Sequence, residues 1–168
     1  AYLREYCETT GAKSFLSSST NYSALAGVQT NLYMYFIPLA FRIVGEDGVS
    51  SYIHPESVYN DPNSGLMRSE MFLRLRLHAQ FRNTLGLFDI DGRNQYSLNV
   101  YGPVSDKVLF NNVCTLFHPA TLEESLSQKS SCFELPLERT DDGKWDLRGH
   151  PDRVVVVSED TLATFASL

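Results

Sequence analysis

The spacing of apolar and polar residues in the first part of the chain predicts two helices separated by a polar loop. Apolar residues within positions 2–7 have helical spacing, which indicates a short helix ending at Gly11. Residues 14–23 are rich in serine, threonine and asparagine and are typical of a loop. A broad apolar face over 28–44 predicts a second helix, which Pro38 should kink or divide.

The middle of the chain predicts a buried strand, a long loop and a third helix. Residues 45–48 begin and end with glycine and indicate a turn, and the apolar run 49–53 that follows predicts a buried strand. Residues 54–65 include two prolines and predict a long connecting loop, a kind of segment that is often functional. An apolar stripe then favours a helix over 67–80, with His78 in a surface or packing position.

The second half of the chain predicts strands in a hairpin and a terminal strand–helix unit. Candidate strands at 81–88 and 95–101 flank an Asp-Gly turn signal, which favours an antiparallel hairpin. A strand is expected at 108–117, a helix at 119–126 that begins at a Thr121–Glu124 capping signal, and a strand at 154–157. Ser158 should cap a last helix over 159–165, whereas 127–149 is polar and loop-like with a weak apolar patch at 133–137. This order predicts an α/β sheet with an antiparallel hairpin at one edge.

Composition narrows the class of protein. The 168 residues carry 14 lysines and arginines against 20 acidic residues, a net charge of −6, which disfavours a non-specific nucleic-acid clamp. With 43% hydrophobic residues and no apolar run near the ~20 residues of a membrane span, a globular cytoplasmic protein without a membrane partner is expected. The sequence has three cysteines, Cys7, Cys114 and Cys132, whose spacing fits neither a zinc site nor a disulfide framework. We therefore expect them to be reduced thiols.

Common catalytic motifs are missing from the sequence. It contains no G-x-G pair, so neither a dinucleotide-binding fingerprint nor a P-loop is present, and it contains no G-x-S-x-G nucleophile elbow. The four histidines are far apart and predict no metal site. These residues alone predict an α/β domain and assign it no catalytic or binding activity.

Several stretches, in their order and spacing, nevertheless resemble one family. They are QTNLY (29–33) followed by Phe36; GVSSYIHPESVYNDP (48–62); LRLRLHAQFRN (73–83) running on to LFDI (87–90) and YSLNVYG (96–102); and NVCTLFHP (112–119), GKWD (143–146) and GHPDR (149–153). These stretches resemble the later half of the adenine-N6 DNA methyltransferase domain of large type IIG restriction-modification enzymes and related phage-defence methylases, together with the segment that follows it.

The resemblance implies a fold and a division of the chain. The expected fold is a partial class I, Rossmann-like methyltransferase sheet with an antiparallel hairpin edge, over residues 1–118, followed by a βα extension over 119–168. In that family a Gly-rich turn holds S-adenosylmethionine, and an Asn/Asp-Pro-Pro-Tyr/Phe loop holds the flipped adenine. The sequence has neither, and it opens at Ala1 without methionine. It is therefore expected to be an inactive fragment that holds no catalytic residue and no cofactor of its own, although its parent would use S-adenosylmethionine.

The resemblance also assigns candidate site residues. Phe88 would stack on the extruded adenine and repay part of the unstacking cost of a few kcal/mol. A plain core position for Phe88 is the alternative. Residues expected near the cofactor pocket are Asn31, Tyr33, His54, Pro55 and Glu56. For Asn31 and Tyr33, packing between the helix and the sheet is the alternative. Residues expected to contact DNA phosphates, or alternatively to form a solvated helix face, are Arg68, Arg74, Arg76, Arg82 and Arg93.

Three functional hypotheses remain open at this stage. The first is a fragment of a DNA adenine methyltransferase, whose partners would be DNA and the remainder of the parent chain. The second is a non-catalytic DNA- or protein-binding module that docks through 127–149 and the C-terminal strand–helix unit. The third is a hydrolase of unrecognised type. The unpaired edge of a partial sheet would also favour self-association of the fragment.

Overall fold

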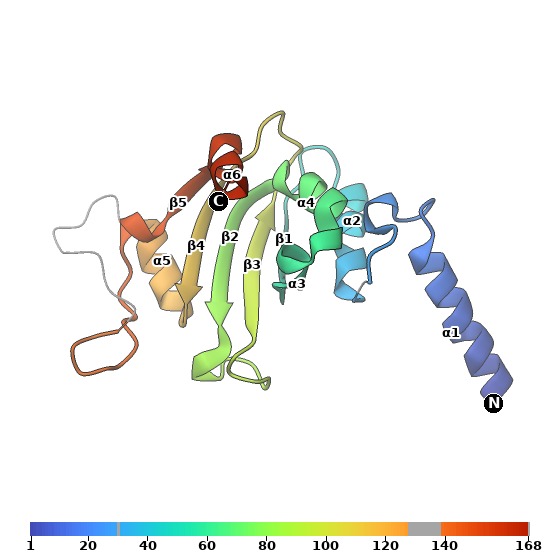
Figure 1. Cartoon of the computed structure of the whole chain (residues 1–168), viewed down its shortest axis with the longest axis horizontal. Helices are drawn as coiled ribbons and strands as arrows, with labels where there is room; N and C mark the ends of the chain where they lie inside the picture. Colours follow the sequence, from blue (N-terminus) through green and yellow to red (C-terminus); the bar gives the residue numbers. More distant parts are fainter. Residues whose placement is uncertain (30, 128–138, 168) are drawn as a thin grey trace.

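A mixed five-stranded sheet organises the computed structural model of the chain, which describes residues 1–29, 31–127 and 139–167 (Figure 1). The strand order across the sheet is β1-β3-β2-β4-β5. The strands are β1 (Ser50–Pro55), β2 (Leu75–Arg82), β3 (Gln95–Tyr101), β4 (Leu109–Leu116) and β5 (Val155–Ser158). The prediction of a mixed α/β protein is confirmed, but the β2–β3 hairpin lies inside the sheet rather than at its edge.

Strand direction places three strand ends at one edge of the sheet. β1 and β2 are both antiparallel to β3, so they run parallel to each other, and β4 is parallel to β2. β5 is antiparallel to β4 and forms the edge strand opposite β1. The carboxyl ends of β1, β2 and β4 therefore lie at the same edge, the lower edge in Figure 1, which we call the carboxyl edge. In open α/β sheets this is the edge where ligands bind.

Six α-helices of the described residues accompany the sheet, and all except α1 lie close to it (Figure 1). They are α1 (Tyr2–Ser17), α2 (Tyr33–Ile43), α3 (Ser57–Asn60), α4 (Gly65–Phe72), α5 (Pro119–Ser127) and α6 (Glu159–Ala166). One buried cluster joins Ile37 of α2 and Met71 of α4 to Tyr101 of β3. A second cluster joins Ala79 and Val113 to Leu122 of α5. Because Tyr101 and Ala79 lie on opposite sides of the pleat, the two clusters form on opposite faces.

Helix α1 extends away from the sheet and is longer than the sequence predicts (Figure 1). The predicted end at Gly11 is wrong, and the first part of the expected loop over 14–23 is helical. Gly11 does not adopt the left-handed conformation that ends many helices, so it only lowers helix propensity. No residue of α1 is buried.

The predicted helix over 67–80 is wrong in its second half. The chain leaves α4 after Phe72 and enters β2 at Leu75, which places His78 in the middle of a strand. From 73 to 77 apolar and polar residues alternate strictly, which is the period of a strand and not of a helix. This alternation dominates the local structure because β2 has neighbours on both sides, β3 and β4.

Other element boundaries also differ from the prediction. The second helix begins at Tyr33 rather than at 28, and the expected loop 54–65 contains α3. β1 is an edge strand and not a buried one, since Ile53 is 58% exposed. The first hairpin strand lies at 75–82 rather than 81–88, because a short 3-10 helix begins at Asn83.

Several predictions are confirmed closely. β3 has the expected bounds, and β4, β5 and the last helix differ by one or two residues. Ser158 caps α6 through a reciprocal capping box with Thr161. By contrast, Thr121 is buried within α5 and donates to the Leu147 carbonyl, so the capping signal predicted there is wrong. The apolar patch at 133–137 and Cys132 lie outside the described residues.

The turn between α2 and β1 is confirmed and tightly built. Gly45 has a left-handed φ of 83°. A side chain at Gly48 would place its Cβ atom 2.1 Å from the Val44 carbonyl oxygen. Real Cβ atoms do not approach that closely, so this turn depends on glycine at position 48.

Candidate functional site

Phe88 lies in an apolar pocket at the carboxyl edge. The pocket has a volume of about 400 Å³, and its lining includes Ile53, His54, Pro55, Phe88, Ile90 and Tyr96. Phe88 is 43% exposed, and its ring meets the Tyr96 ring edge-on at a centroid distance of 4.9 Å. Phe88 is therefore not a core phenylalanine: part of its ring is free to contact a ligand.

Asn83 holds the backbone that carries Phe88. Asn83 follows β2 and is 1% exposed. Its side-chain amide donates to the carbonyl oxygens of Phe88 at 2.9 Å and Ile90 at 2.8 Å, and its Oδ1 accepts from the Phe88 amide at 3.0 Å. Three hydrogen bonds to one buried side chain fix this loop against the sheet. Sequence reasoning missed Asn83, because a single asparagine after a strand has no distinctive spacing.

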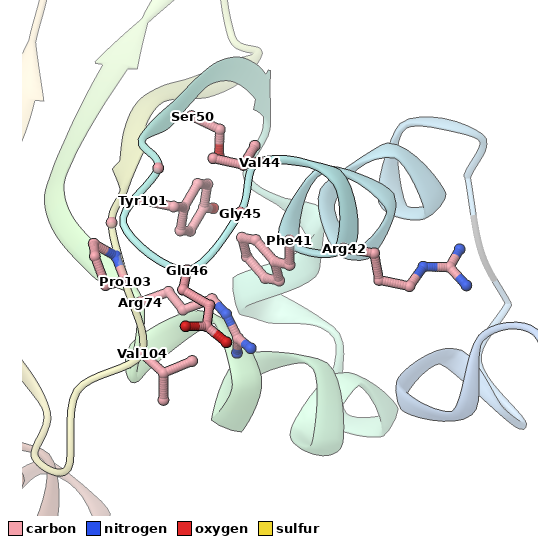
Figure 2. Close-up of a pocket in the computed structure, with 12 residues that line it drawn as sticks. Phe41, Arg42, Val44, Gly45, Glu46, Ser50, Arg74, Tyr101, Pro103 and Val104 are labelled. Carbon is pink, nitrogen blue, oxygen red and sulfur yellow. The ribbon is translucent and has the colours of Figure 1, made fainter.

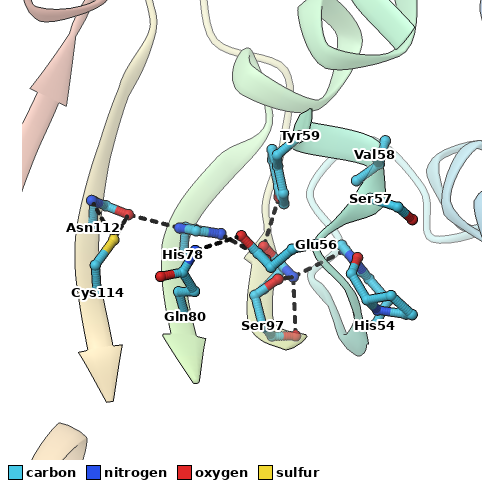
Figure 3. A network of polar contacts seen from close by, with 12 residues as sticks. His54, Glu56, Ser57, Val58, Tyr59, His78, Gln80, Ser97, Asn112 and Cys114 are labelled. Carbon is cyan, nitrogen blue, oxygen red and sulfur yellow. Dashed lines mark hydrogen bonds and ion pairs between the residues drawn. The ribbon is translucent and has the colours of Figure 1, made fainter. Parts of the chain in front are cut away.

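A buried ion pair lies across β1 and β2 (Figure 3). Glu56 directly follows β1, and its Oε1 is 3.2 Å from Nε2 of His78 on β2. The other oxygen, Oε2, accepts from the Gln80 side chain at 3.0 Å. Nδ1 of His78 is 2.7 Å from Oδ1 of Asn112 on β4. Both ring nitrogens thus face acceptors, an arrangement that only the doubly protonated imidazolium satisfies.

Electrostatics favour the charged form of this pair. Burial by itself lowers the pKa of His78, but hydrogen bonds to Cys114 and Glu56 and the charge of Glu56 outweigh burial and raise that pKa to about 9. Burial raises the pKa of Glu56, but the hydrogen bond and charge of His78 bring it below its ordinary value. The pair is therefore ionised at neutral pH. It was missed because His78 was expected on a helix.

A second branch of the network leads to His54 at the end of β1. Asn99 donates through Nδ2 to Nε2 of His54 at 2.9 Å, and Nδ1 of His54 lies 2.9 Å from the Pro55 carbonyl oxygen. The ring therefore carries its proton on Nδ1, because Nε2 accepts. Burial lowers the pKa of His54, so this histidine is neutral while His78 is charged.

Tyr33 connects α2 to the same region. Its ring stacks on His54 at a centroid distance of 5.2 Å. Its hydroxyl lies 2.6 Å from Ser57 Oγ and accepts from the Val58 amide at 3.1 Å. The structure thus brings together Tyr33, His54, Pro55 and Glu56, whereas Asn31 is exposed two residues before α2. Their proposed place beside a cofactor stays a prediction.

The predicted phosphate-contacting arginines do not form one surface. Arg68 donates to the carbonyl oxygens of Val58 and Asp61, and so braces the α3 segment. Arg74 and Arg76 lie at the amino end of β2, whereas Arg82 ends that strand about 20 Å away. Exposed Arg93 forms an ion pair with Asp91. Arg82 and Arg93 alone are near the carboxyl edge, and phosphate contact stays a prediction for all five residues.

A smaller pocket lies at the opposite end of the strands (Figure 2). Its volume is about 250 Å³, and its lining includes Phe41, Arg74 and Tyr101. The Arg74 guanidinium lies 4.7 Å from the centre of the Phe41 ring, a cation–π contact. This contact holds Arg74 within the structure and away from the carboxyl edge.

Comparisons with known proteins do not assign a family. No protein-family model matches the chain, and no curated protein matches it. Among the described residues no helix is both long and apolar enough to cross a membrane. The same residues hold no group of three histidine, cysteine or acidic side chains placed to bind a metal ion.

Proposed function

We propose that this chain is the later half of an S-adenosylmethionine-dependent DNA adenine-N6 methyltransferase of a restriction-modification or phage-defence enzyme. Its role in the parent is to complete the sheet and to present Phe88 to an adenine extruded from the duplex. The chain alone is inactive, because the cofactor-binding turn and the catalytic Pro-Pro loop are absent from its sequence.

The position of Phe88 is the observation that carries the proposal. An aromatic ring that stacks on a flipped base must expose a face, be held rigidly and lie at the ligand edge of the sheet. Phe88 is 43% exposed in an apolar pocket at the carboxyl edge, and Asn83 fixes its backbone. His54 and Pro55 line the same pocket.

The sheet arrangement is compatible with the proposal. An antiparallel strand, β3, lies between the parallel strands β1 and β2. The resemblance likewise implies a sheet that includes an antiparallel hairpin. β4, which belongs to residues 1–118, and β5, in the extension over 119–168, continue the sheet on the other side of β2.

The described side chains expected near the cofactor are already engaged within the chain. The polar atoms of Tyr33, His54 and Glu56 are hydrogen-bonded to neighbours within the chain. These side chains would shape one wall of a pocket without binding S-adenosylmethionine directly. The groups that hold the cofactor must come from the rest of the parent.

A stacking assay tests the proposal on the chain as it is. Single-stranded DNA containing 2-aminopurine, a fluorescent adenine analogue, is titrated with the protein, and quenching reports stacking on an aromatic ring. Phe88→Ala should weaken binding by about 1–3 kcal/mol, or roughly 5- to 150-fold, whereas Phe88→Trp should retain it. Phe36→Ala is the matched control, because Phe36 is also a half-exposed phenylalanine, on α2.

Two outcomes would contradict the proposal. Equal quenching by the wild type and by Phe88→Ala would remove Phe88 from base recognition. Transfer of tritiated methyl groups to DNA by the isolated chain would show that it contains the catalytic residues that we place elsewhere in the parent.

A further inference from the structure

A second pocket at the carboxyl edge gathers cationic side chains from distant parts of the chain. It has a volume of about 410 Å³ and lies beside the ends of β2 and β4. Its lining includes Arg82, Gln95, Cys114, Thr115, Asp146 and Arg153. Gln95 also lines the Phe88 pocket, so the two pockets are neighbours.

Cationic side chains outnumber acidic ones among the described residues that line this pocket. Arg82 and Arg153 face one acidic side chain, Asp146. Asp146 is already neutralised by Arg148, whose Nη2 lies 2.6 Å from its Oδ2 and whose Nε also donates to it. Among the described lining residues, an anion entering the pocket therefore meets the guanidinium groups of Arg153 and Arg82 and a carboxylate that is paired with Arg148.

Arg153 has hydrogen-bonding capacity left over. Its Nε and Nη2 atoms are buried and have no hydrogen-bond partner among the described residues. These two nitrogens form one edge of the guanidinium, the edge that binds a phosphate or carboxylate with two parallel hydrogen bonds. They are covered in this structure, and contact with an anion in the pocket requires the Arg153 side chain to turn toward it. That turn breaks no hydrogen bond of these two atoms to the described residues.

The backbone beside the pocket is strained. Thr115 has φ 58°, and it is the only residue other than glycine with a positive φ in the described part of the chain. It lies at a bulge in β4, where the pairing with β2 shifts between Ala79 and Phe81. A β-branched residue in this conformation costs of order 1–3 kcal/mol, and such strain is concentrated at ligand sites. The bulge places Thr115 on the wall of the pocket.

We propose that this pocket binds a phosphate-ester anion, with Arg153 and Arg82 as its cationic ligands and the Thr115 bulge as one wall. If the proposed function is correct, the anion is a backbone phosphate of DNA whose adenine occupies the neighbouring Phe88 pocket; this assignment of the ligand rests on that function. The anion site itself does not depend on it.

Two probes test the anion site and the identity of its biological ligand separately. The first is inorganic phosphate, which should raise the melting temperature of the wild type above its value in chloride at equal ionic strength. Arg153→Gln should abolish this rise, and Arg153→Lys should retain part of it, because lysine keeps the charge without the fork. Arg4→Gln, on exposed α1, is the control that removes the same charge elsewhere.

The second probe is a fluorescent DNA duplex followed by anisotropy. Arg153→Gln should weaken binding about tenfold at about 50 mM salt and lower the slope of log affinity against log salt by roughly 0.9. Arg4→Gln should change neither value. Circular dichroism verifies that each variant is folded, and Arg82→Gln provides a second test if Arg153→Gln is not.

The phosphate and DNA experiments together distinguish three outcomes. Loss of both responses in Arg153→Gln supports the site and its DNA ligand. A phosphate response that depends on Arg153 without any DNA binding supports the anion site and contradicts the DNA assignment. A phosphate response that is absent in the wild type, or unchanged in folded Arg153→Gln and Arg82→Gln, overturns the proposal.

Discussion

Replacing His78 with glutamine should remove a pH-dependent part of the protein's stability. His78 is 8% exposed and is paired with Glu56, which is 5% exposed. Glutamine fills similar space and can still hydrogen-bond, but it carries no charge. Comparison of the two proteins at several pH values therefore measures the ion pair separately from the packing of the side chain.

The expected magnitude follows from the pKa of His78. It rises from 6.5 to about 9 on folding, and each pKa unit corresponds to 1.36 kcal/mol, so the charged form contributes about 3 kcal/mol. Because the folded value is the higher one, this stability is fully present below pH 6.5. It is lost progressively as the pH rises through about 9, where the folded protein also releases the proton.

Urea denaturation at pH values between 6 and 10 tests this reasoning. The difference in free energy of unfolding between wild type and His78→Gln should fall by about 3 kcal/mol across the range. His118→Asn is the control: His118 is exposed and accepts from the Ala120 amide at the start of α5, and asparagine can replace that acceptor. A difference that stays constant with pH would show that His78 is not held in its charged form.

Three further predictions test other parts of the structure. Asn83→Ala should lower the melting temperature by removing the hydrogen bonds that fix Phe88, at a cost of about 1–3 kcal/mol, and should weaken 2-aminopurine quenching. Gly48→Ala should destabilise the protein by several kcal/mol in urea titrations, because its Cβ would collide with the Val44 carbonyl oxygen; a loss below about 0.5 kcal/mol would mean that the turn can relax. Ser158→Ala should cost about 1 kcal/mol in the same assay through loss of the α6 cap, and Ser158→Asp should restore most of it.

The sequence was most informative where one local signal acted alone. Ser158 is followed by a short amphipathic segment and caps a helix as predicted, and β3 was located correctly from its strand-forming residues before Gly102. At 73–80 two signals competed. An apolar stripe continued the helix of the preceding residues, while strict alternation favoured a strand. Neighbouring strands on both sides of β2 decide the outcome, and they are not visible in a local window.

The candidate site was predictable only in part. The resemblance predicts Phe88, His54 and Pro55 as site residues, and all three line one pocket of the structure. The Glu56–His78 pair could not be found, because it needs a register in which β1 and β2 lie on either side of β3. Likewise, nothing in the sequence joins Arg153 to Arg82, since the sheet order β2-β4-β5 and the 3-10 helix before β5 bring them to one pocket.

The position of β3 between β1 and β2 has a consequence for how the chain folds as it is synthesised. β1 is complete at Pro55 and β2 at Arg82, but the strand that joins them begins only at Gln95. When β1 and β2 of a nascent chain have left the ribosome, they cannot yet take their places in the sheet. The position between them belongs to β3, which is still inside the ribosome. The Glu56–His78 pair forms across that same gap, so it belongs to the late steps of folding. Non-local pairing of this kind slows folding, and chains interrupted before Gln95 would expose two unpaired strands to aggregation.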